Sequence, residues 1–137
     1  MPQHDDYGKM ILQKAVGPAF KETGRSVEID YGVGSPARID GTIGQEIAVE
    51  IESRVSKQVR GAVLDLICHK YKKKLLVLLP VHMSNPETTA DQCRYIFGRF
   101  LDRKDYHVVV LEGDGDNPQE TTDIKIVQGA IQKLRTG

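Results

Sequence analysis

Features that mark several classes of protein are missing from this sequence. Its longest apolar run, residues 75–81, is interrupted by Pro80 and is far shorter than the roughly 20 residues that a membrane-spanning helix needs. Its first residues, 1–6, are polar and acidic, unlike a secretion signal. These absences predict a cytoplasmic protein with no membrane partner.

Paired cysteines and the common nucleotide-binding loops are also missing. The two cysteines, Cys68 and Cys93, lack the spacing of a disulfide framework or a zinc site, so we interpret both as packing residues in a reducing compartment. The four histidines are scattered without zinc spacing. There is no Gly-Lys-Ser/Thr phosphate loop, and Gly32 and Gly34 lack the third glycine of a dinucleotide loop.

An excess of charge is absent as well, because 19 Lys and Arg balance 19 Asp and Glu. This balance argues against a protein that coats nucleic acid through bulk electrostatics. The only basic run, residues 69–74, is most simply interpreted as a solvated helix end. What is present, 39% hydrophobic and 28% charged residues in a chain of 137, is typical of a globular protein, and we expect one domain over residues 1–137.

The periodicity of apolar residues predicts nine elements in the order α-β-β-β-α-β-α-β-α. Three meandering strands followed by two crossover units predict an α/β fold with a mixed central β-sheet flanked by helices. Asn85 and Pro86 are expected as the cap and first residue of one helix, and Ser53 or Ser56 as the cap of another. The expected helices are residues 8–21, 55–72, 86–101 and 122–134, and the expected strands are residues 27–31, 37–43, 46–52, 75–79 and 107–111.

Three acidic side chains gather on two adjacent expected strands. Because side chains alternate along a strand, Asp40, Glu50 and Glu52 all face away from the apolar side. The short connection at residues 44–45 predicts a hairpin that brings Asp40 within reach of Glu50. Neighbouring carboxylates either raise one pKa or bind a cation, and oxygen ligands suit Mg²⁺, for which Mn²⁺ can substitute. The sequence therefore predicts metal-assisted hydrolysis of a phosphodiester.

The Ile-Asp-Gly segment around Asp40 and residues 48–53, followed by a helix, resemble the PD-(D/E)XK nuclease superfamily, which has the restriction-endonuclease-like fold. The resemblance covers nearly the whole chain in element order, but only these two segments in motif. It implies Asp40 and Glu50 as metal ligands, with the backbone carbonyl of Ile51 as a further oxygen. Glu52 stands where the family usually has lysine, and the resemblance implies a proton acceptor or a further ligand there.

A positive charge that replaces this lysine has to come from elsewhere. Lys57 and Arg60, in the first turns of the next expected helix, are the nearest candidates for contact with DNA phosphates. The alternative for both is an ordinary solvent-facing position. For the three acids, the alternative is a solvated sheet face balanced by lysines.

These patterns favour a Mg²⁺-dependent DNA endonuclease of restriction or repair type, in which Asp40 and Glu50 hold the metal and Glu52 activates water. A second hypothesis is a nuclease-fold binding or regulatory subunit of a nucleic-acid complex, without turnover. A third is a nuclease that resembles Holliday-junction resolvases, which are similarly small and dimeric. Because the chain has little length for a target-recognition domain, we expect a homodimer or a separate recognition subunit.

Overall fold

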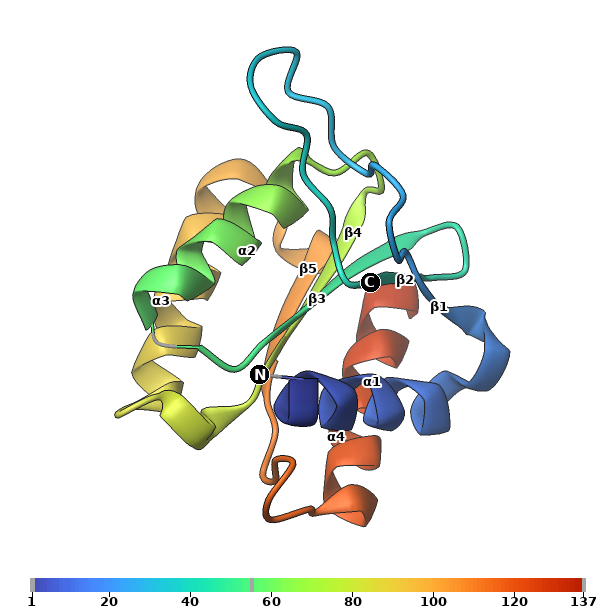
Figure 1. The fold of residues 1–137 in the computed structure, drawn as a ribbon, viewed down its shortest axis with the longest axis vertical. Helices are drawn as coiled ribbons and strands as arrows, with labels where there is room; N and C mark the ends of the chain where they lie inside the picture. Colours follow the sequence, from blue (N-terminus) through green and yellow to red (C-terminus); the bar gives the residue numbers. More distant parts are fainter. Residues whose placement is uncertain (1, 55, 137) are drawn as a thin grey trace.

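A five-stranded sheet forms the centre of the computed structural model, which describes residues 2–54 and 56–136, without the side chains of residues 2, 56 and 57 (Figure 1). The strand order is β1-β2-β3-β4-β5, antiparallel from β1 to β3 and parallel from β3 to β5. The expected mixed central sheet is therefore confirmed. The strands are β1 (Phe20–Glu22), β2 (Gly41–Ile43), β3 (Ile47–Glu52), β4 (Lys73–Leu78) and β5 (Tyr106–Val110).

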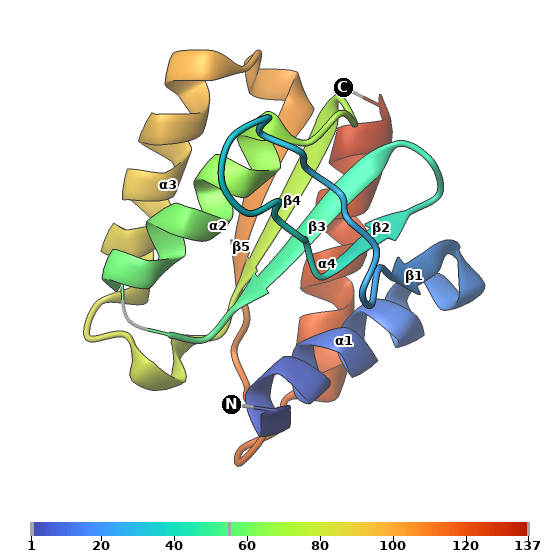
Figure 2. The same cartoon turned by 45° about the horizontal axis from the view of Figure 1, so that its top comes forward.

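Helices cover both faces of the sheet, as expected for an α/β protein. α1 (Pro2–Val16) and α4 (Glu120–Thr136) lie on one face, and α2 (Ser56–Cys68) and α3 (Pro86–Phe100) lie on the other (Figure 2). Period-two alternation sends Val49 and Ile51 into the first layer and Ala48 into the second. None of the described helices is both long and apolar enough to span a membrane. Short 3-10 turns at Gly17–Ala19, Pro80–His82 and Arg103–Asp105 complete the fold.

The later elements follow the sequence patterns closely. Asn85 caps α3, where its side chain accepts a hydrogen bond from the Thr88 N–H at 3.1 Å, and Pro86 is the first helical residue. Residues 74–78 of β4 are all buried, as a parallel strand between two helical layers requires. The predicted ends of β4, α3, β5 and α4 differ from the observed ones by at most two residues, whereas the helix predicted for residues 55–72 ends four residues early, at Cys68.

The N-terminal third departs from the predicted boundaries. The first helix ends at Val16, where Gly17 adopts a φ of +61°, so that Phe20 begins strand β1 instead of closing the helix. The predicted strand at residues 27–31 is wrong: only one bridge forms there, between Ile29 and Ala37. The edge strand is instead the short segment β1, whose pairing with β2 across an 18-residue connection leaves no local pattern.

The basic run at residues 69–74 lies outside a helix, because α2 ends at Cys68. Lys70 and Lys72 are exposed, as predicted, but Lys74 lies inside β4 and is 2% exposed. Its Nζ donates to the His69 carbonyl oxygen at 2.6 Å, which provides the buried ammonium with an acceptor. Of the cysteines, Cys93 is buried as expected, whereas Cys68 is exposed at the end of α2.

Candidate functional site

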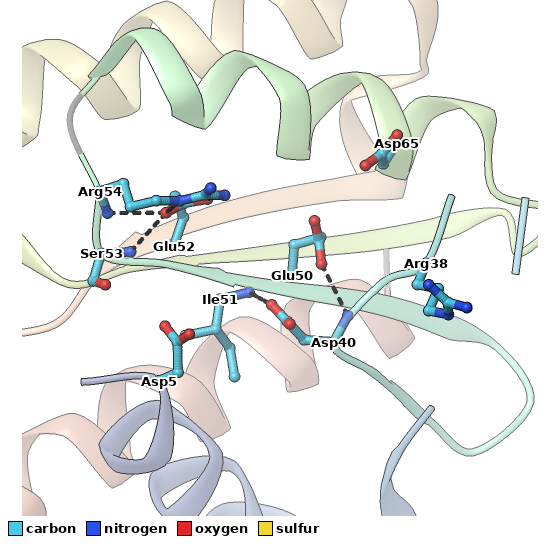
Figure 3. Close-up of a pocket in the computed structure, with 9 residues that line it drawn as sticks. All are labelled: Asp5, Arg38, Asp40, Glu50, Ile51, Glu52, Ser53, Arg54 and Asp65. Carbon is cyan, nitrogen blue, oxygen red and sulfur yellow. Dashed lines mark hydrogen bonds and ion pairs between the residues drawn. The ribbon is translucent and has the colours of Figure 1, made fainter. Parts of the chain in front are cut away.

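A cleft of about 410 Å³ opens beside the C-terminal half of β3, between α1 and α2 (Figure 3). The chain enters β2 on one side of this cleft, and β3 leaves the sheet on the other. Its walls are almost wholly polar, which distinguishes it from an ordinary packing defect. It is lined by Asp5, Arg38, Asp40, Glu50, Ile51, Glu52, Ser53, Arg54 and Asp65.

Asp40 and Glu50 are held together by reciprocal hydrogen bonds between backbone and side chain. The Asp40 N–H donates to Glu50 Oε1 at 2.9 Å, and the Ile51 N–H donates to Asp40 Oδ2 at 2.7 Å. Asp40 lies one residue before β2 and so extends the hairpin that the sequence predicts. Both carboxyl groups are therefore fixed by the main chain of the neighbouring segment.

The backbone of Ile51 also faces this pair. Along a strand, the N–H and C=O groups of successive residues alternate between the two neighbouring strands. The Glu52 carbonyl accepts from the Leu79 N–H at 2.9 Å, so Glu52 pairs toward β4. The N–H and C=O of Ile51 therefore point the other way, toward Asp40. This is the side on which the carbonyl would have to lie to serve as a further oxygen ligand.

Burial sets the electrostatics of the two carboxyl groups. Desolvation, the negative charge of Asp40 and a hydrogen bond with Asp40 raise the pKa of Glu50 to about 9. Desolvation also raises the pKa of Asp40, against the lowering effect of the Ile51 N–H. Within the described chain, neither carboxyl group forms an ion pair with a lysine, arginine or histidine. Two partly buried acids without a cation are thus joined in one cleft.

Glu52 has a different environment, although it shares the cleft. Its carboxylate is buried and accepts from Arg54 Nε at 2.7 Å and from Arg54 Nη2 at 2.6 Å. The backbone N–H groups of Ser53 and Arg54 donate to the same carboxylate at 3.1 and 2.9 Å. Burial alone would raise the pKa of Glu52, but these donors and the Arg54 charge hold it below its ordinary value.

The structure thus brings together part of the predicted site. Asp40, Glu50 and Ile51 converge, whereas Glu52 lines the same cleft but is bound to Arg54. Arg60 is exposed on α2, does not line the cleft, and lies close enough to Cys93 of α3 to lower the pKa of its thiol against burial. The side chain of Lys57 lies outside the described residues.

Sequence reasoning missed Arg54, whose guanidinium lines the cleft, whereas Lys57 and Arg60 were the candidates that it offered for a positive charge there. The signal was available, because Arg54 stands two residues after Glu52, the spacing that keeps two side chains of an extended segment on one side. Arg38 lines the opposite side of the cleft, and its Nε donates to the Arg25 carbonyl at 3.1 Å. Asp5 reaches the cleft from α1 and had no sequence signal at all.

The Asp40 and Glu50 pair fits a hard divalent cation by the chemistry of its donors. Both side chains offer carboxylate oxygen, and Mg²⁺ needs only one or two protein carboxylates when water and phosphate complete its octahedron. Burial and the charge of Asp40 together raise the pKa of Glu50, and a cation between the two carboxylates would oppose both effects. Asp40, Glu50 and the Ile51 carbonyl are therefore the residues that could hold the metal.

A second group of metal-ligating residues lies near the N-terminal end of α1, where His4 meets the loop that contains Asp114 and Asp116. Among the described residues, His4, Asp114 and Asp116 alone form a set of three such residues with ligand atoms within 4.8 Å of one another. The Gly115 N–H donates to His4 Nδ1 at 3.1 Å, which places the imidazole proton on Nε2, facing Asp116 Oδ2 at 3.9 Å. Because neither ring nitrogen then offers a free lone pair, this group is better explained as a set of contacts that hold the loop at Gly115 against α1.

Comparison with protein families, with curated proteins and with solved structures finds no match to this chain. What the cleft can do is therefore inferred from its geometry and chemistry.

Proposed function

We propose that this protein is a Mg²⁺-dependent DNA endonuclease with a restriction-endonuclease-like fold, of restriction or repair type. The observation that supports this most is the joined pair of Asp40 and Glu50, two acids with raised pKa values in a polar cleft that form no ion pair with a cation among the described side chains. Arg38 and Arg54 line the same cleft and would attract a phosphodiester. The element order α-β-β-β-α-β-α-β-α agrees with the resemblance.

Asp40, Glu50 and the Ile51 carbonyl would hold the ion. When bound, Mg²⁺ supplies polarisation of the phosphate and a lower pKa for an attacking water. Arg54 is 59% exposed at its side chain while Glu52 fixes its direction, so its remaining guanidinium hydrogens can donate to a phosphate oxygen. It stands two residues after the position where the family usually has lysine. Arg38 would contact a phosphate of the DNA strand on the other side of the cleft.

Glu52 was predicted as the proton acceptor for the attacking water. A carboxylate with a lowered pKa that already accepts four hydrogen bonds is a weak base. We therefore favour a role in which Glu52 positions Arg54. A phosphate oxygen or bulk water would then take the proton.

A binding or regulatory subunit without turnover is the second candidate function, and one observation favours it. The ion pair between Glu52 and Arg54 neutralises both groups in the resting site, so no free charge stands at the position of the family's lysine. Such a subunit would bind DNA but would not need Mg²⁺ to do so. Metal dependence therefore separates the two functions.

The decisive experiment is incubation of the purified protein with supercoiled plasmid, linear duplex and branched DNA in Mg²⁺, Mn²⁺ or EDTA. We expect strand cleavage in either metal and none in EDTA. Preference for branched over linear DNA would favour the resolvase-like alternative. The oligomeric state, measured by light scattering on the same sample, tests the expected homodimer against a chain that needs a recognition subunit.

Conservative variants test the metal ligands. Asp40→Asn and Glu50→Gln keep the side-chain volumes but remove the charges, and each should lower the cleavage rate at least about 100-fold. Glu112→Gln, the same change at an exposed residue outside the cleft, should leave the rate unchanged. Full cleavage by either cleft variant would exclude the pair as metal ligands.

A further inference from the structure

A basic groove runs along β5, the edge of the sheet farthest from β1. Two hollows of about 490 and 270 Å³ adjoin there, since Arg103, Tyr106 and His107 line both. α3 closes the first hollow and α4 the second. We call this surface the β5 groove, and it is separate from the cleft that Asp40 and Glu50 share.

The register of the sheet fixes this separation. Tyr106 pairs with Lys74 at the start of β4, whereas Glu52 pairs with Leu78 at its end. The β5 groove and the cleft thus lie at opposite ends of the parallel strands. β4 separates β3 from β5 in the sheet (Figure 2).

The β5 groove carries an excess of positive charge in a chain whose charges otherwise balance. Arg94, Arg103, Lys104 and Lys133 line it, and Asp91 is the only acid among its lining residues. Asp91 is already bound to Arg94 at 2.8 Å. Within the described chain, Arg103, Lys104 and Lys133 form no ion pair. Three exposed cations therefore face one groove without compensation.

The cations of the groove also act on His107, which lines both hollows. Burial lowers the pKa of His107, and the positive charges of Lys133 and Arg94 lower it further. These two cations come from α4 and α3, the helices on either side of β5. An anion in the groove would meet attraction from both sides.

Aromatic rings accompany the charges. The Tyr95 ring is 68% exposed on α3, although tyrosine usually buries most of its area. Tyr106 stacks on the buried Phe97 at 5.2 Å between ring centroids, so its ring packs against the core at the floor of the groove. An exposed ring beside free cations is the combination that binds single-stranded nucleic acid, because bases stack on the ring while phosphates contact the cations.

An extended acidic peptide that pairs with the free edge of β5 is the alternative occupant. Its charge would complement the cations of the groove, but its backbone could not pair fully with β5. Arg94 Nη2 donates to the Val108 carbonyl at 2.9 Å and so occupies an acceptor on the free edge of β5. Strand addition needs that carbonyl for its own hydrogen bond. The charge, the ring and the blocked edge together favour a nucleic-acid strand.

We propose that the β5 groove binds a single-stranded phosphodiester chain, with phosphates on Arg103, Lys104 and Lys133 and a base stacked on Tyr95. The binding does not depend on catalysis in the cleft. It would give the protein a second contact with nucleic acid at the far edge of its sheet.

Fluorescence anisotropy with a labelled oligothymidylate of about 20 nucleotides, in EDTA, tests this proposal. Affinity should fall with salt, and Arg103→Ala or Lys133→Ala should reduce the slope of log K against log salt by about 0.7 each. Tyr95→Ala should weaken binding by roughly five- to hundredfold with little change in slope, and Tyr95→Phe should restore it. Lys21→Ala, the same charge removal on the opposite edge strand, is the matched control.

Four results would overturn the proposal: no binding at low salt, groove variants that behave like Lys21→Ala, equal competition by duplex DNA, or equal competition by polyglutamate. An oligouridylate of the same length distinguishes RNA from DNA as the source of the strand, and tighter binding of either supports the groove. Since EDTA removes divalent ions, loss of this binding and loss of cleavage are separate outcomes.

Discussion

Burial of the Glu50 carboxyl group links its ionisation to the stability of the fold. Its pKa is about 9 in the folded chain and near the ordinary 4.5 when unfolded, so the folded state binds the extra proton between these values. Stability in EDTA should therefore fall as pH rises from about 5 to 9. Glu50→Gln removes this loss and should be more stable than the wild type at pH 8 by on the order of 4 kcal/mol, with little difference at pH 5.

Urea unfolding at both pH values measures this difference. Glu112→Gln is the control, because its carboxylate is exposed and its curve should run parallel to that of the wild type. A Glu50→Gln variant that gains nothing at pH 8 would show that the carboxyl group is not held neutral in the cleft.

Lys74 shows the opposite dependence on pH at the start of β4. Desolvation by burial lowers its pKa to about 8 from an ordinary 10.5, so the unfolded chain binds the extra proton between these values. The wild type should therefore gain stability relative to Lys74→Met as pH rises from 8 to 10, by on the order of 1–2 kcal/mol. Denaturant unfolding at both pH values checks this, with the exposed Lys72→Met as control. Equal pH dependence of the two variants would contradict it.

The β1–β2 pairing is the element that positions the cleft, and it depends on Gly41. A Cβ at Gly41 would lie 2.5 Å from Phe20 Cε1 and 2.8 Å from the Lys21 carbonyl oxygen, so any side chain there pushes β1 away. Gly41→Ala should destabilise the fold by about 1–3 kcal/mol and, because Asp40 precedes it, should also weaken metal binding. Chemical denaturation and calorimetry with Mn²⁺ measure the two effects.

Gly61 on α2 offers a matched control, since a Cβ there meets no atom within 4 Å. Gly61→Ala should leave metal binding unchanged and stabilise the helix by about 0.5–1 kcal/mol. If Gly41→Ala behaved in the same way, the close packing of Phe20 over Gly41 would not be a structural requirement.

Sequence periodicity predicted the elements that carry their own signals. β3 has alternating apolar residues, β4 is an apolar run, and Asn85 and Pro86 mark the start of α3. All three elements therefore lie near their predicted positions. β1 has only three residues, one of them apolar, and is recognisable only through its partner β2. The strand expected at residues 27–31 alternates correctly, but its only pairing is one bridge to Ala37. Alternation alone cannot tell a paired strand from an extended loop.

The candidate site shows the same limit for side chains. Asp40 and Glu50 meet as predicted, because a hairpin register follows from strand alternation and a short turn. The direction of Glu52 did not follow from alternation within the strand, because it depends on a bidentate contact with Arg54 beyond the end of the strand, for which the two-residue spacing was the sequence signal. Alternation along a strand determines on which face of the sheet a side chain lies. Which residue it then contacts depends on three-dimensional packing.

At the scale of the whole molecule, metal binding at the proposed site would be linked to release of a proton and to the stability of the fold. At pH 7 the Glu50 carboxyl group is mostly protonated, so a bound cation must displace about one proton. A ligand that binds only the folded chain raises its stability by an amount that grows with its concentration relative to its Kd. Affinity for Mg²⁺ or Mn²⁺ should therefore rise from pH 6 toward pH 9.

Titration calorimetry with Mn²⁺ at pH 7, in two buffers of different ionisation enthalpy, counts this proton directly. We expect release of about one proton per bound ion, and a melting temperature that Mn²⁺ raises more at pH 8 than at pH 6. Glu50→Gln should abolish both effects, whereas His4→Ala should preserve them, since His4 belongs to the separate group with Asp114 and Asp116. Binding that survives in Glu50→Gln but disappears in His4→Ala would move the metal site to the group of His4, Asp114 and Asp116 and remove the support for a nuclease centre in the cleft.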